Sequence, residues 1–208
     1  MKILGGEWKV TTFIDALKKR RSFYGISKES TISDARIQEI VEEAVKYTPT
    51  SFNSQTSRAV VLLGEQHDKL WNHTEEILRE VVGNEEAFQS TAEKMASFRA
   101  GYGTVLYFED NNVIAQLQQN FASYADNFPI WANQSNGMLQ LVIWTALEEE
   151  GLGASLQHYN PLIDEKVKQE WNIPEHWRLI AQMPFGKPTA TPGDKEFQPI
   201  EERVKVYN

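Results

Sequence analysis

Residues 48–55 form a polar loop whose side chains could line a ligand site. They read Thr-Pro-Thr-Ser-Phe-Asn-Ser-Gln, and six of the seven residues after Pro49 carry side chains that donate or accept hydrogen bonds. Pro49 disfavours helix at the residue before it, so we expect the preceding helix to end at Thr48. A polar loop between a helix and a strand suits a ligand with many heteroatoms, although most polar loops are only solvated.

A second polar cluster, Lys18-Lys19-Arg20-Arg21-Ser22, ends the first predicted helix. Cations at a helix C-terminus complement the helix dipole, and this explanation suffices for two of the four. Adjacent guanidinium groups beside a hydroxyl are also the donors that a phosphate monoester needs. From the residues alone, the cluster is either a helix end or an anion site.

The elements around these clusters predict a helix-rich α+β fold, with residues 1–208 as a single domain and two smaller domains as the alternative. Apolar residues at helical spacing predict a first helix, capped by Thr11 or Thr12 and ending at Lys19, and further helices over residues 33–47, 65–82, 84–100, 113–120, 128–150 and 164–171. Apolar runs predict strands at 59–63, 103–108 and 177–183 and an extended segment at 154–159. We expect turns at 109–112 and 184–188, and an alternating edge strand at 200–207.

The helix predicted over residues 128–150 is the most apolar in the chain. Its apolar residues cover more than one face, so it is expected to be the central buried helix. Its aromatic residues are explained by core packing without any cofactor. Gly151 follows the helix and suits a left-handed cap, which also needs no ligand.

Composition excludes several classes of function. The net charge of −8 argues against non-specific binding to nucleic acid or to an anionic membrane surface. The absence of cysteine excludes disulfides, thiolate nucleophiles and cysteine metal sites. No histidine spacing resembles metal ligation, and no apolar run is long enough for a signal peptide or a membrane span. We therefore expect a cytoplasmic protein without a metal, a membrane or a nucleic-acid partner.

Taken together, the clusters resemble the nitroreductase family of flavin enzymes. The resemblance rests on Arg-Arg-Ser at 20–22, Pro-Thr-Ser-Phe-Asn-Ser-Gln at 49–55, Glu-Gly-Leu-Gly-Ala-Ser at 150–155 and the basic residue Arg203. It spans nearly the whole chain and is strongest to the short subgroup found in yeasts and lactic-acid bacteria. It implies a nitroreductase-like fold, with helices around a small, mostly antiparallel sheet and a C-terminal strand given to the partner subunit.

The resemblance further implies a homodimer with FMN at the subunit interface, which reduces small aromatic acceptors with NADH or NADPH. Carried over by position, Arg20 and Arg203 hold the FMN phosphate, and Arg21 and Ser22 lie on phosphate and ribityl oxygens. The remaining cofactor residues implied along the flavin and ribityl chain are Ser51, Asn53, Gln55, Gln157 and His158. Hydride passes from the nicotinamide to the flavin and then to the acceptor, so ping-pong kinetics are expected and no catalytic side chain is required.

This chain departs from the family pattern at two places. Thr56-Ser57 stands where the family usually has Pro-Trp, and Tyr24 stands where many members have lysine. The second departure leaves the partner of the flavin N1/O2 edge unassigned.

Three aromatic residues are candidates for the wall of the acceptor slot: Phe52, Phe128 and Trp131. Flat acceptors gain from stacking on aromatic faces. Core packing is the alternative for all three. For the whole protein, the alternatives to an oxidoreductase are a flavin-binding regulatory or sensor module with little turnover, and a structural protein without a cofactor, which would be colourless.

Overall fold

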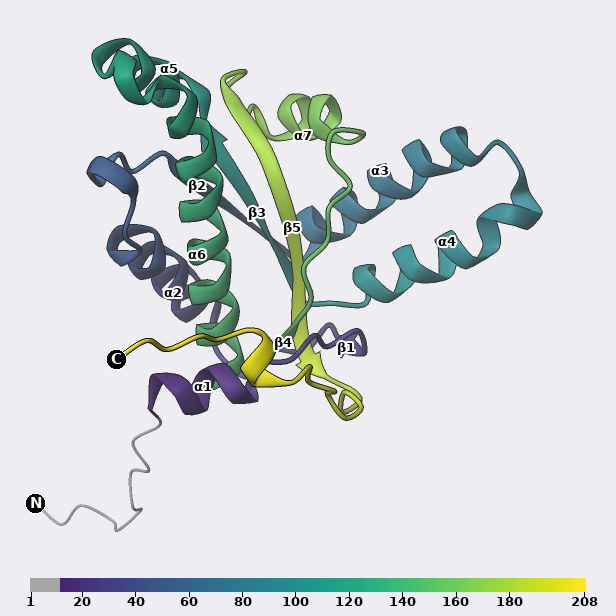
Figure 1. Ribbon diagram of the computed structural model, residues 1–208. Coiled ribbons are helices and arrows are strands. Elements are labelled where there is room, and N and C mark those ends of the chain that lie inside the picture. Colours follow the sequence, from purple (N-terminus) through teal and green to yellow (C-terminus); the bar gives the residue numbers. More distant parts are fainter. Residues whose placement is uncertain (1–11) are drawn as a thin grey trace, which may run out of the picture.

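The computed structural model describes residues 12–208 as helices on both faces of one sheet (Figure 1). The α-helices are α1 (Phe13–Lys19), α2 (Asp34–Tyr47), α3 (Glu65–Val82), α4 (Glu85–Arg99), α5 (Asn111–Asn120), α6 (Phe128–Glu149) and α7 (Asp164–Trp171). The strands are β1 (Ile26–Ser27), β2 (Ser57–Leu63), β3 (Gly103–Asp110), β4 (Gly153–Ala154) and β5 (Trp177–Pro188). Short 3-10 turns lie at Ser51–Asn53, Ala122–Asn127 and Ile200–Glu202.

The sheet has the strand order β1-β5-β3-β2, and its ladders are antiparallel. The short β4 pairs with β5. Every residue of β3 is buried, because β2 and β5 flank it and helices cover both faces. On the other side of β3 from β5, the sheet ends at β2, which therefore forms one edge of the sheet.

The core has two layers, one on each face of the sheet. Val105 and Tyr107 of β3 pack with α2 and α6, whereas the alternating Leu106 and Phe108 pack with α3, α4 and α7. This alternation follows the two-residue period of a strand. The helix α6 lies centrally on its face, as predicted, but it is only partly buried, because Ile130, Met138 and Val142 are exposed.

The α+β class, the arrangement of helices around a small antiparallel sheet and most helix bounds are confirmed. Helices α3 and α7 have the predicted bounds, and Thr12 and Ser33 cap α1 and α2 through their hydroxyls. Gly151 takes a φ of 85°, as expected for a left-handed cap. Within the described residues, no helix has the length and hydropathy needed to cross a bilayer.

The turn predicted at 184–188 is wrong, because β5 continues through Pro188. Pro184 lies opposite Thr104 in the ladder, and its carbonyl accepts a hydrogen bond from the Ser155 N–H at 3.3 Å. Gly186 serves close packing, since a Cβ there would lie 2.2 Å from the Ser27 carbonyl oxygen. Pro184 and Gly186, which predicted a turn, therefore lie within a strand and pack against the backbone of neighbouring segments.

Two other predictions need correction. The turn expected at 109–112 is absent, because β3 runs to Asp110 and α5 starts at Asn111 with Asp110 as its cap. The edge strand expected at 200–207 is also absent from the described chain: a 3-10 turn covers Ile200–Glu202 and the exposed residues after it form no strand. An alternating sequence needs an open strand beside it, and the tail instead runs past α1 and the end of α6 (Figure 1).

Candidate functional site

The polar loop after α2 has an unusual backbone. Phe52, Asn53 and Gln55 have φ values of 59°, 49° and 49°, in the left-handed region that non-glycine residues seldom occupy. The Gln55 N–H donates to Thr50 Oγ1 at 2.9 Å, and Arg58 Nη1 donates to the Gln55 carbonyl at 2.6 Å. Three such residues in one short loop indicate a conformation that the surroundings enforce, as is common at binding sites.

Phe52 lies at the centre of an aromatic cluster. The residue is 53% exposed, and its ring centroid lies 5.4 Å from that of Phe128 and 6.0 Å from that of Trp131, with the Trp131 ring close to parallel. Phe121 and Tyr124 complete the cluster at 5.1 and 6.1 Å. The structure therefore brings together all three predicted slot residues. Phe128 is buried and supports the others from behind, whereas Phe52 presents an open ring.

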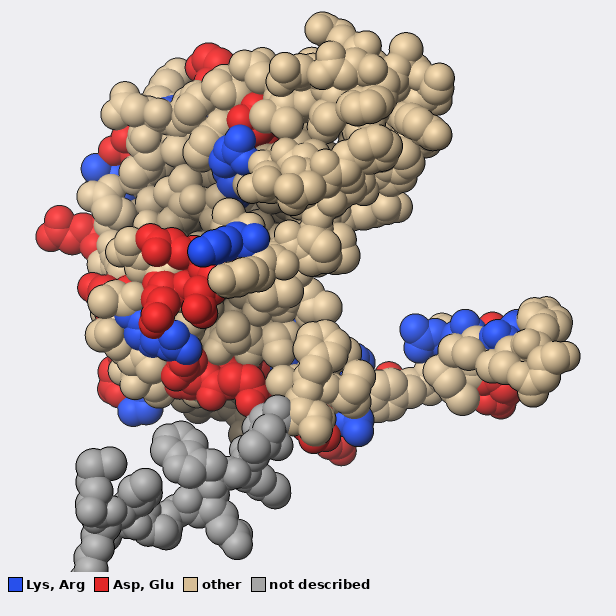
Figure 2. Space-filling model, turned by 90° about the vertical axis from the view of Figure 1, so that its left-hand side faces the viewer, with Lys and Arg blue, Asp and Glu red and all other residues tan. Residues whose placement is uncertain are grey.

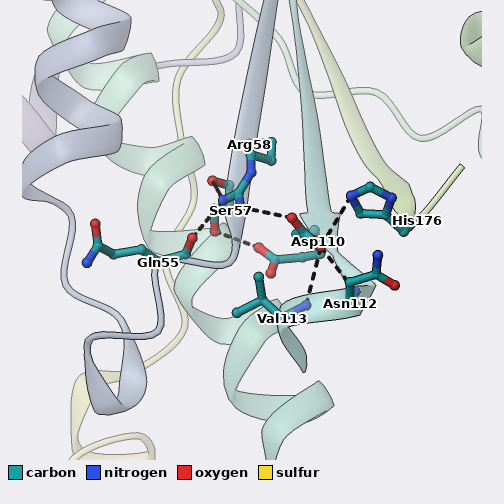
Figure 3. A network of polar contacts seen from close by, with 8 residues as sticks. Gln55, Ser57, Arg58, Asp110, Asn112, Val113 and His176 are labelled. Carbon is teal, nitrogen blue, oxygen red and sulfur yellow. Dashed lines mark hydrogen bonds and ion pairs between the residues drawn. The ribbon is translucent and has the colours of Figure 1, made fainter. Parts of the chain in front are cut away.

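Arg58 and Asp110 join this loop to α5, a link that sequence reasoning missed (Figure 3). Arg58 Nη2 lies 2.9 Å from Asp110 Oδ2, and Asp110 Oδ1 accepts hydrogen bonds from the N–H groups of Asn112 and Val113 at 3.1 and 3.3 Å. His176 Nε2 lies 3.7 Å from the same oxygen. The ion pair thus fixes the polar loop relative to the helix that leads to Phe121.

A buried carboxylate lies beside this link. Glu109 is 0% exposed, and its Oε1 accepts hydrogen bonds from Ser57 Oγ at 2.5 Å and from Asn136 Nδ2 at 2.8 Å. Gln140 Nε2 in turn donates to Asn136 Oδ1 at 2.7 Å. Ser57 is one of the two residues that replace the family's Pro-Trp, so this departure has a local structural partner. The network fixes α6 against the sheet.

The second predicted cluster lies at the other end of α6. The Arg20 guanidinium stacks over Trp144, 4.3 Å from the ring centroid. Its buried Nη1 has no hydrogen-bond partner among residues 12–208. A buried, charged donor without an acceptor is costly, so this atom suits an anionic ligand. The structure therefore fits the phosphate expected from the Arg-Arg-Ser sequence.

The other residues predicted to contact the cofactor lie in the turn after α1, after β4 and in the C-terminal tail. Arg21 and Ser22 follow Arg20, and Ser22 forms a bridge to Ala154 of β4. Beyond β4, Gln157 pairs with Gln182 and donates from Nε2 to Ser155 Oγ at 3.0 Å, while His158 is exposed. Arg203 is exposed, and its side chain makes no hydrogen bond or ion pair within the part of the chain that the structure describes.

The two clusters are far apart within one chain. Phe52 packs on Trp131 near the start of α6, whereas the backbone N–H of Arg21 contacts Glu148 near its end. Seventeen residues of helix separate Trp131 from Glu148, which corresponds to about 26 Å at a rise of about 1.5 Å per residue. Ser51, Asn53 and Gln55 therefore do not meet Arg20 in one subunit.

Glu148 is the acidic residue at the Arg20 end. Its Oε2 accepts from the Arg21 N–H at 2.8 Å, and its Oε1 accepts from Trp144 Nε1 at 2.9 Å. Burial raises the pKa of Glu148 to about 7, against the lowering effects of the Arg21 N–H and the Arg20 charge. No sequence signal pointed to this residue, since the motif that resembles the family begins only at Glu150. Among the described residues, no group of His, Cys, Asp and Glu is placed to hold a metal ion.

Comparison with known proteins agrees with the resemblance to the nitroreductase family. The profile of the nitroreductase family matches residues 17–187. HBN1 of Saccharomyces cerevisiae is 37% identical over 203 residues, which cover 96% of this chain and 98% of HBN1. Nitroreductase CinD of Lactococcus lactis, solved in complex with chloramphenicol, is 43% identical with a TM-score of 0.88, covering 95% of this chain and 100% of CinD. Another CinD structure, at 42% identity, contains 4-nitrophenol, with a TM-score of 0.86 and the same coverage of both chains.

Proposed function

Because this chain belongs to the nitroreductase family, a family of oxidoreductases, we propose that it binds FMN, takes hydride from NADH or NADPH, and reduces nitroaromatics, quinones or similar small acceptors. The observation that carries the proposal is the Arg20 guanidinium, which stacks on Trp144 with a buried Nη1 that has no acceptor within residues 12–208. We also expect the enzyme to work in the cytoplasm, in keeping with a chain that has no cysteine.

Arg20 and Arg203 would hold the FMN phosphate, with Arg21 and Ser22 on phosphate and ribityl oxygens. Trp144 holds the Arg20 guanidinium by stacking, so little side-chain entropy is lost when an anion arrives. A dianionic phosphate needs paired cations, and Arg203 in the otherwise exposed tail would supply the second charge.

Ser51, Asn53 and Gln55 would contact the flavin and ribityl chain of the same cofactor, together with Gln157 and His158. Since the loop that carries the first three lies at the opposite end of α6 from Arg20, they would come from the partner subunit. We therefore propose a homodimer in which each of two cofactor sites takes its Arg-Arg-Ser end from one copy and its polar loop from the other.

The surface and the tail support this assembly. Residues 111–147 contain a single charged residue, Asp126, and Figure 2 shows a broad uncharged area on one face of the molecule. Val204 and Val206 are 53% and 77% exposed on the tail. The edge strand β2 borders a groove of about 490 Å³ lined by α2, β2 and α6 residues, among them Val45, Ala59 and Leu139. The alternating tail of a partner would add a strand at this edge.

Phe52 and Trp131 would form the wall on which flat acceptors stack. CinD binds chloramphenicol and 4-nitrophenol in its structures, and both compounds carry a nitrophenyl group. FMN would supply the redox chemistry by accepting hydride at N5 and passing it on. The chain's own residues would bind, orient and stack the cofactor and the acceptor. Because the nicotinamide and the acceptor would use one slot in turn, we expect ping-pong kinetics.

The visible spectrum of the purified protein and its steady-state kinetics test this proposal. We expect flavin absorption bands, and oxidation of NADH or NADPH with 4-nitroquinoline oxide, nitrofurazone or menadione that gives parallel double-reciprocal lines. A colourless protein that binds no added FMN would contradict the proposal. A flavin spectrum without turnover on any of these acceptors would favour a sensor module.

A further inference from the structure

Glu148 forms hydrogen bonds with two groups beside Arg20, the backbone of Arg21 and the side chain of Trp144. One carboxylate oxygen accepts from the Arg21 backbone N–H at 2.8 Å, and the other accepts from Trp144 Nε1 at 2.9 Å. The Trp144 ring in turn carries the Arg20 guanidinium. One side chain therefore fixes both the turn that holds the arginines and the ring on which Arg20 stacks.

The carboxylate has specific charged neighbours. Arg20 and Arg21 face it from the turn after α1. The next two acidic residues along the chain are engaged elsewhere: Glu149 lies 3.2 Å from Lys19 Nζ, and Glu150 lies 2.8 Å from Arg36 Nε. The segment after β5 reaches this place through the Gly193 carbonyl, which accepts from Arg21 Nη2, while its charged residues Asp194 and Lys195 are exposed.

We propose that Glu148 is a positioning residue for the cofactor phosphate, which holds the Arg20 and Arg21 donors in place and, through its charge, limits how tightly they bind the phosphate. This inference rests on the proposed FMN function. Its first part follows from the two hydrogen bonds. Its second part follows because a carboxylate beside two arginines competes with any anion that those arginines attract.

The direction of the pH effect follows from this competition. Burial already raises the pKa of Glu148 to about 7, so a second negative group nearby would raise it further. Phosphate binding then favours the protonated carboxyl and takes up a proton. FMN affinity should fall as pH rises through and above 7. The phosphate monoester itself gains negative charge near pH 6, which strengthens binding as pH rises. The contribution of Glu148 is therefore measured by comparing a Glu148 variant with wild type at the same pH.

Titration of the FMN-free protein with FMN, followed by quenching of flavin fluorescence, tests the inference at pH 5.5 and pH 8.5. Glu148→Gln keeps the shape of the side chain and one acceptor oxygen but removes the charge. If phosphate binding raises the pKa of Glu148 by about one unit, this variant should bind FMN about tenfold more tightly than wild type at pH 8.5 and equally at pH 5.5. Glu149→Gln is the matched control, since it removes the same charge one residue along and should change neither affinity.

Two further measurements separate positioning from charge. Glu148→Ala removes both acceptor oxygens and should bind FMN at least about fivefold more weakly than Glu148→Gln, since each lost charge-assisted bond leaves a donor unpaired. Riboflavin, which has no phosphate, should bind wild type and Glu148→Gln equally. Thermal unfolding of each variant checks that the protein is folded.

The inference is overturned if Glu148→Gln binds FMN like wild type at pH 8.5, or if Glu149→Gln gains affinity to the same extent. Equal affinity of the Ala and Gln variants would overturn the positioning role. The proposed function fails in a different way, namely if wild type binds no FMN at either pH.

Discussion

Replacing Phe52 by Ala should change how the enzyme handles acceptors more than how it folds. Truncation of a buried Phe to Ala costs about 3–5 kcal/mol. Because Phe52 is 53% exposed, about half of that cost applies, or roughly 2 kcal/mol. In a domain of this size each kcal/mol lowers Tm by about 2–4 °C, so we expect a loss of about 4–8 °C.

The effect on acceptors follows from the stacking contact. An aromatic contact is worth about 0.5–1.5 kcal/mol beyond burial, so KM for a flat acceptor should rise about two- to tenfold in Phe52→Ala. A bulky quinone and a small nitroaromatic should be affected unequally, which alters acceptor preference. Steady-state kinetics with menadione and nitrofurazone, alongside thermal unfolding and the FMN content, measures all three effects.

Phe128→Ala is the matched comparison, because the two rings are in contact with centroids 5.4 Å apart but Phe128 is only 3% exposed. Phe128→Ala should lower the free energy of unfolding by the full cost, roughly 3–5 kcal/mol, and the variant should also lose bound flavin. If Phe52→Ala loses as much stability as Phe128→Ala and keeps the wild-type acceptor profile, Phe52 belongs to the core and the slot lies elsewhere.

Three other predictions follow from the structure. Arg20→Ala or Arg203→Ala should weaken FMN binding by about one to two decades in dialysis, since one charge-assisted contact is worth about 1.5–3 kcal/mol; unchanged retention would exclude both as phosphate ligands. Burial lowers the pKa of His67 from 6.5 to about 4, so between these pH values the unfolded chain binds more protons than the folded chain. The free energy of unfolding should therefore fall by up to about 3 kcal/mol as pH drops from 6.5 to 4. Denaturant unfolding should show a smaller fall in the His67→Gln variant. Sedimentation should give a dimer at micromolar concentration that Val206→Asp weakens, and an active wild-type monomer with bound FMN would refute the assembly.

The sequence predicted those parts of the fold that depend on local periodicity. The bounds of α3 and α7, and the caps at Thr12 and Ser33, follow from apolar spacing and from side chains that bond their own helix ends. The error at 184–188 has a different origin. Pro184 and Gly186 predict a turn in isolation, and only the pairing of this segment with β3, β4 and β1 from distant parts of the chain makes them strand residues.

The site shows the same division. Residue types at the ends of helices led to the prediction of Arg20, Ser51 and Asn53 as site residues, because a cluster of donors is visible in a short stretch. Arg58 and Glu148 were missed, since each acquires its meaning from a partner 52 or 127 residues away. Alone in the sequence, each looks like an ordinary surface charge on a strand or a helix.

The distance between the two clusters gives α6 a role beyond core packing. A single apolar helix carries Trp131 near one end and Trp144 and Glu148 near the other, so in the proposed dimer it would set the separation of two half-sites. If each cofactor needs one half-site from each copy, then FMN binding and subunit association stabilise each other, because a ligand that binds only the dimer shifts the equilibrium toward it. Ile130, Met138 and Val142, 54%, 42% and 38% exposed on this helix, would then be buried by the same event that completes the sites. In the proposed dimer, the apolar surface that is unfavourable in one chain would thus couple assembly to the cofactor.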